Sequence, residues 1–182
     1  MADLGGAARM PPQATIFDLL DESMNEHAIY IGTILFCHLI VEQVLYELLA
    51  HAHAQRSEPL TASEKLSFAQ KIDRCTRTYI AVDGRSRPIL SPKLAAALRM
   101  LNDLRNKMAH TYKVIPSYEQ VHSIVRALGD AGIDFTDNFD ATPVVAGSYG
   151  YDELGMLEES VKHLLLDLGF VLLEAGGPNI IS

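Results

Sequence analysis

The fold is decided by residues 91–110, which read SPKLAAALRMLNDLRNKMAH. The apolar residues of this stretch recur at intervals of three and four, the spacing of one face of an α-helix. They are Leu94, Ala97, Leu98, Leu101, Leu104 and Met108. Ser91 and Pro92 are typical of the cap and first position of a helix. The stretch therefore predicts a helix with an apolar seam that must pack against other helices.

Helical patterns also lie on both sides of this stretch. Upstream, apolar spacing predicts a short helix at about 15–24 and a long helix at about 26–54. Thr61-Ala62-Ser63-Glu64 is a capping box that opens a helix to about residue 82, where Asp83-Gly84 ends it. Downstream, Ser117 caps a helix closed by Gly129, and a final helix spans 152–176. With no β-hairpin pattern found, the expected fold class is all-α, a bundle of five or six helices.

Length and composition favour one globular domain. The chain has 182 residues, of which 48% are hydrophobic and 21% charged. We expect a flexible tail at 1–14 without the features of a secretory signal, and a single helical domain at 15–182 that includes an acidic loop at 129–151. The apolar run at 28–41 is shorter than the ~20 residues of a membrane span. The sequence therefore predicts a buried helix in a soluble, cytoplasmic protein with no membrane partner.

Charge is unevenly distributed along the chain. The formal net charge is −8, yet residues 61–113 hold 11 basic against 4 acidic side chains. The overall charge argues against a stand-alone, high-affinity nucleic-acid binder. The basic middle nevertheless permits one positive face to meet a polyanion, while a solvated face on two helices explains the same pattern.

The chemistry-bearing residues gather at the end of the 91–110 helix. Asn102, Asn106 and His110 lie in one line at i, i+4 and i+8, so Asn106 is placed to orient the His110 ring. Arg105 and His110 lie some 140° apart around a straight helix and converge poorly within one chain. They meet only if the helix bends or a second copy brings its own pair alongside.

This motif resembles the signature of the HEPN superfamily, an Arg, a polar residue and a His after four to six intervening residues. Here Arg105-Asn106 precedes His110 with four residues between the Arg and the His. Residues 67–73 together with Glu42 also resemble the mannitol operon repressor branch of that superfamily. The resemblance covers roughly residues 26–128 and implies an HEPN-like bundle.

The resemblance implies a homodimer in which two copies of the motif line one cleft. In catalytic members that cleft cuts RNA without a metal or other cofactor. Arg105 would hold the phosphate, His110 would transfer protons, and Asn106 would orient the imidazole. Candidate substrate-binding residues are Asn102, Lys107 and Lys113. Such enzymes act as toxins or phage-defence effectors, and Tyr112 matches a tyrosine that is modified in HEPN toxins paired with a nucleotidyltransferase antitoxin.

Two functional hypotheses stay open from the sequence. The first is the metal-independent endoribonuclease just described. The second is a non-catalytic regulatory or protein-interaction module like the mannitol operon repressors, which uses the same seam to dimerise and the acidic loop to contact a protein partner. The other histidines show no metal-ligand pattern, and His38 fits a core histidine. Cys37 and Cys75 fit buried thiols.

Overall fold

The computed structural model describes residues 27–57, 66–111, 114–135 and 151–180. The predicted tail, the helix at 15–24, the capping box at 61–64, most of the acidic loop, and Tyr112 and Lys113 lie outside these residues. In the described ranges the chain is predominantly helical, which confirms the all-α expectation at that level. The helices are α2 (His27–Gln55), α3 (Phe68–Arg77), α4 (Pro92–His110), α5 (Tyr118–Asp130) and α6 (Glu153–Glu174).

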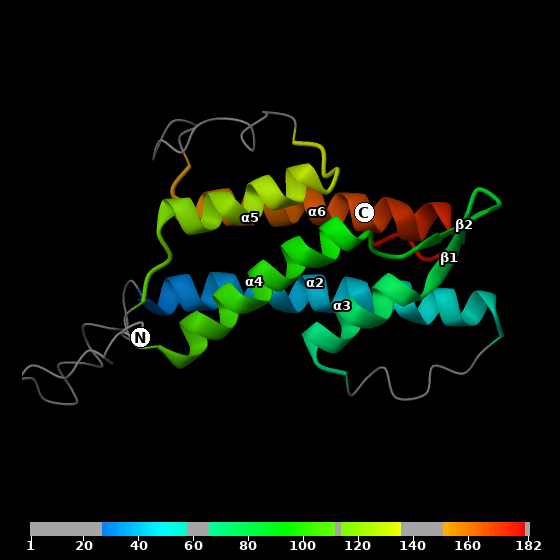
Figure 1. Ribbon diagram of the computed structural model, residues 1–182, viewed down its shortest axis with the longest axis horizontal. Coiled ribbons are helices and arrows are strands. Elements are labelled where there is room, and N and C mark those ends of the chain that lie inside the picture. The colour runs from blue at the N-terminus through cyan, green and yellow to red at the C-terminus, as the bar shows by residue number, and fades with distance from the viewer. Residues whose placement is uncertain (1–26, 58–65, 112–113, 136–150, 181–182) are drawn as a thin grey trace, which may run out of the picture.

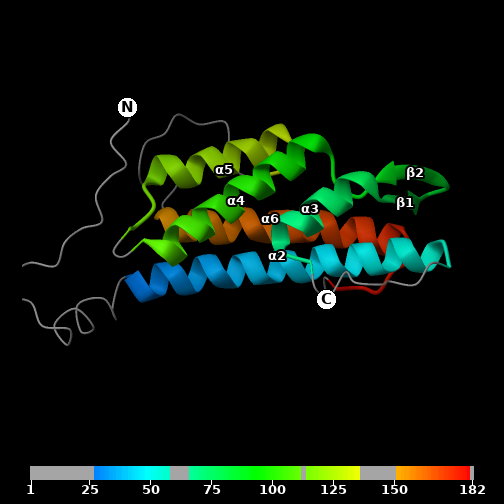
Figure 2. The same ribbon diagram turned by 60° about the horizontal axis from the view of Figure 1, so that its bottom comes forward.

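The helices pack side by side around one apolar core. α2 and α6 run together along the long axis, and α4 crosses them with α3 on one side and α5 on the other (Figures 1 and 2). The seam predicted for residues 91–110 is buried, from Leu94 at 8% exposure to Ala97 at 0%. α4 contacts α2, α3 and α5, whereas α2 contacts α3, α4 and α6.

Several helix ends follow their sequence signals. Ser91 accepts a hydrogen bond from the Leu94 amide with Pro92 in the first turn, as predicted. Ser117 caps α5 in a capping box with Gln120. The end of α5 differs from the prediction, because Gly129 stays inside the helix and Gly132, at φ 101°, supplies the left-handed turn.

The helix predicted from 61 to 82 is wrong at its C-terminal end. α3 ends at Arg77, and residues 79–82 form strand β1 (Tyr79–Val82), which pairs antiparallel with β2 (Arg85–Pro88). Asp83 and Gly84 both have positive φ, 49° and 73°, which is the backbone of a two-residue hairpin turn. The expectation of no β-hairpin is therefore also wrong: Asp-Gly stops a helix but closes a hairpin equally well.

The described start of α3 uses a signal other than the predicted one. Ser67 accepts from the Gln70 amide, and the Gln70 side chain accepts from the Ser67 amide, which makes a complete capping box. This cap turns Lys71 and Cys75 inward toward α2. Cys37 and Cys75 are free and buried, as predicted, and burial raises the pKa of these thiols to about 11 and about 12.

Candidate functional site

Arg105 lies five residues before the end of α4 and is half-buried. Its Nη1 donates a hydrogen bond of 2.9 Å to Asn106 Oδ1, and its Nε is buried without a hydrogen-bond partner in the described part of the chain. The predicted role of Asn106 therefore shifts: among the described residues its carbonyl oxygen accepts from the Arg105 guanidinium and not from the His110 imidazole. A guanidinium fixed on one side keeps its other donors for an anion.

His110 is the last residue of α4, and its side chain is exposed. α4 runs without a break to His110, and Thr111 follows it in an extended conformation. Arg105 and His110 therefore project about 140° apart. One chain alone does not bring these two side chains together, which matches the sequence expectation.

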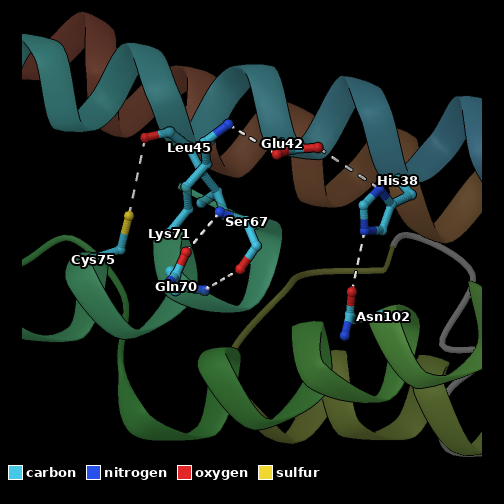
Figure 3. A network of polar contacts seen from close by, with 8 residues as sticks. All are labelled: His38, Glu42, Leu45, Ser67, Gln70, Lys71, Cys75 and Asn102. Atoms are coloured by element: carbon cyan, nitrogen blue, oxygen red, sulfur yellow. Dashed lines mark hydrogen bonds and ion pairs between the residues drawn. The ribbon is translucent and has the colours of Figure 1, made fainter. Parts of the chain in front are cut away.

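The side chain of Asn102, one of the predicted substrate-binding residues, is half-buried and contacts α2. Its Oδ1 accepts from His38 Nε2 at 3.3 Å (Figure 3). His38 is 5% exposed, and its ring packs on Phe68 with centroids 4.1 Å apart. This contact joins residues 64 positions apart in the chain and fixes one face of α4 against α2.

A charged pair completes the network behind His38. Lys71 donates to Glu42 at 2.9 Å, and the second carboxylate oxygen of Glu42 lies 4.0 Å from His38 Nδ1 (Figure 3). Glu42 and Lys71 are among the residues on which the resemblance to the mannitol operon repressor branch was based, and here they join α3 to α2. Their role in the described structure is packing of two helices.

The pKa of His38 is lowered, chiefly because burial disfavours the charged imidazole. The positive charges of Arg105 and Lys71 act in the same direction, whereas the Asn102 hydrogen bond and the Glu42 carboxylate oppose it. The sequence alone gave His38 no partner, because its contacts come from two other helices.

The remaining predicted residues lie at different places. Lys107 is exposed and lines a shallow hollow of about 290 Å³ between α4 and α5, so it points away from Arg105. Lys113 and Tyr112 lie outside the described residues. In the parts of the chain that the structure describes, no three His, Cys, Asp or Glu side chains gather as metal ligands.

The outer face of α2 carries large exposed apolar side chains. Ile29, Phe36 and Leu39 are 60%, 63% and 51% exposed and follow one another at helical spacing. The half of α2 that carries them lies next to the end of α4 in both ribbon views (Figures 1 and 2). Exposed apolar patches on a helix face mark interaction surfaces.

α2 has the length and composition of a membrane-crossing helix over residues 28–55. It nevertheless contains His38, Glu42 and Glu47 and packs on α3, α4 and α6, as does the core helix of a soluble protein.

Comparison of the chain with known proteins finds no matching protein-family model, no matching curated protein and no matching solved structure. The functional argument therefore rests on the chemistry of the residues themselves.

Proposed function

We propose that this protein is a cytoplasmic, metal-independent endoribonuclease of the HEPN type that acts as a homodimer. The observation that carries the proposal is that the last turns of α4 hold both an Arg105 guanidinium restrained by Asn106 and an exposed His110 imidazole. The two groups supply the two chemical needs of RNA cleavage, an anion clamp and a proton-transfer group.

The chemistry requires no further group. A ribose 2′-hydroxyl attacks the adjacent phosphorus, and an imidazole takes its proton. The leaving 5′-oxygen takes a proton from a second imidazole, and the products are a 2′,3′-cyclic phosphate and a 5′-hydroxyl. Arg105 donates hydrogen bonds to the phosphorane oxygens, which gain negative charge in the transition state.

A second copy of the chain is part of the proposal. Arg105 and His110 diverge within one chain, and two imidazoles are needed as base and acid. Ile29, Phe36 and Leu39 on the outer face of α2 offer an exposed apolar surface for the second copy. For a composite site, association of the two copies must bring both α4 ends to one cleft.

The test measures RNA cleavage in the presence of a chelator by the wild type and by the variants Arg105→Ala and His110→Ala. The matched control is Arg126→Ala, which removes an exposed arginine from α5. We expect losses of about 10²- to 10⁴-fold for the two site variants and wild-type rates for the control. Cleavage that survives both substitutions would show that the residue assignment is wrong. A wild-type protein that cuts no RNA at any concentration would favour the regulatory module of the second hypothesis.

Mixed dimers test whether the site is composite. A tagged His110→Ala chain purified with one wild-type partner should lose far more than half of the activity, because base and acid come from different chains. Half activity would mean that each chain works alone.

A further inference from the structure

A pocket of about 440 Å³ lies where the ends of α2 and α3 meet, apart from the Arg105–His110 motif. Three arginines line it, Arg56 from the residues after α2 and Arg74 and Arg77 from the last turn of α3. Arg56 donates to the Tyr79 carbonyl oxygen of β1, which fixes this side chain over the pocket. Two segments far apart in the chain therefore bring their guanidinium groups to one hollow.

The acid in this pocket is already neutralised. Among the described lining residues the single carboxylate is Asp73, and it pairs with Arg99 of α4. Arg74 and Arg77 of α3 thus line the pocket beside a carboxylate that Arg99 already pairs with, among the residues that the structure describes. Arg74 and Arg77 lie three residues apart on α3, where like charges repel one another, and an anion between them relieves the repulsion. Arginine forks match the oxygens of a phosphate group better than any other side chain does.

The pocket lies on the same side of α4 as the imidazole of the motif. Arg99, Asn106 and His110 project within about 40° of one another around α4, and Arg99 reaches Asp73 at the pocket edge. Arg99 and His110 are separated by roughly 16 Å along the helix axis. A stacked nucleic-acid strand advances about 3.4 Å per nucleotide. About five nucleotides therefore span the length of α4 between His110 and Arg99, which marks the edge of the pocket.

We propose that this pocket binds backbone phosphates of the RNA strand whose cleavage is proposed above, at a second site several nucleotides from the cut bond. The choice of RNA as ligand rests on the proposed function, whereas the phosphate chemistry rests on Arg74 and Arg77. The site explains how a chain of net charge −8 holds a polyanion: the contacts are confined to one basic face.

The binding test uses Arg74→Gln/Arg77→Gln and a 12-nucleotide RNA with 2′-O-methyl riboses, which cannot undergo attack by the 2′-hydroxyl. Loss of two phosphate contacts should reduce the salt slope of log K by about 1.4 and weaken binding roughly 20-fold near 0.1 M salt. The control Arg126→Gln/Lys162→Gln removes the same charge from α5 and α6 and should bind as wild type. Arg74→Lys/Arg77→Lys should recover much of the binding, because it keeps the charge.

Cleavage of a three-nucleotide RNA, too short to reach the pocket from the motif, separates this proposal from the proposed function. Its kcat/KM should be unchanged in Arg74→Gln/Arg77→Gln. Unaltered affinity and salt slope for the 12-nucleotide RNA would overturn the pocket while the nuclease stands. An equal loss for both RNAs would also overturn it, because the substitutions would then act on the motif or the fold. Weakened 12-nucleotide binding by a chain that cuts no RNA would support the pocket and refute the nuclease.

Discussion

The Glu42–Lys71 pair offers a direct test of how α3 is held on α2. The two groups are 2.9 Å apart with side chains 21% and 10% exposed. Lys71→Met keeps the volume of the side chain but leaves the Glu42 carboxylate with His38 Nδ1 as its nearest described partner, at 4.0 Å. Removing one member of a fully buried pair costs about 3–5 kcal/mol. Because water reaches part of Glu42, we expect a loss of about 2–3 kcal/mol.

Urea unfolding followed by circular dichroism measures this loss, and the thermal midpoint should fall by about 4–12 °C for a chain of this length. The double variant Glu42→Gln/Lys71→Met should recover most of the stability, because no charge is then left without a partner. Lys162→Met, which breaks the exposed Lys162–Glu159 pair at 3.0 Å, is the control and should leave the midpoint unchanged. A Lys71→Met midpoint equal to that of wild type, or strictly additive single effects, would refute the reasoning.

Three further predictions concern the turn, the buried histidine and the thiols. Gly84→Ala should lower the free energy of unfolding in urea by about 1 kcal/mol, because Gly84 has a φ of 73°. Gly32→Ala has open space around the added methyl group and should raise the free energy of unfolding by about 0.5–1 kcal/mol. Equal effects of the two substitutions would contradict the turn geometry. Burial lowers the pKa of His38 in the folded chain, so the unfolded chain binds more protons below about pH 6.5. The contribution of His38 to the free energy of unfolding should therefore be fully present above that pH and be lost as the pH falls through the folded pKa. In the His38→Gln variant the urea midpoint should depend less on pH between about pH 7 and 5. Cys37 and Cys75 should resist a thiol reagent at about pH 8 until urea unfolds the chain, because burial raises the pKa of both thiols; rapid labelling of the native protein would contradict their burial.

Local signals predicted the helices well. The 3–4 spacing of residues 94–108 needs only side-chain size and helix geometry, and it appears in the structure as the buried face of α4. Ser91 and Ser117 act within three residues of themselves, so a reader of the sequence sees both the cap and its target. Asp83-Gly84 was ambiguous because positive φ ends helices and closes hairpins alike.

Contacts between distant segments account for what the sequence did not predict. The bond from His38 to Asn102 depends on how α2 crosses α4, and no spacing rule within either helix contains that information. Asn102 and Asn106 look equivalent in the sequence, one turn apart. In the structure Asn102 is hydrogen-bonded to the buried His38, whereas Asn106 is hydrogen-bonded to the neighbouring Arg105.

The two functional side chains of the motif therefore differ: Arg105 is restrained by a hydrogen bond, whereas His110 is exposed. α2 anchors the face of α4 at Asn102, and Asn106 restrains the Arg105 guanidinium, so the proposed anion clamp exists before any ligand arrives. His110 lies at the exposed helix end and has no hydrogen-bond partner in the described residues, so folding of one chain does not set its orientation. On the proposed function, RNA or the second copy must supply that restraint. Proton transfer by His110 would then be linked to assembly, whereas phosphate binding by Arg105 would belong to the single chain.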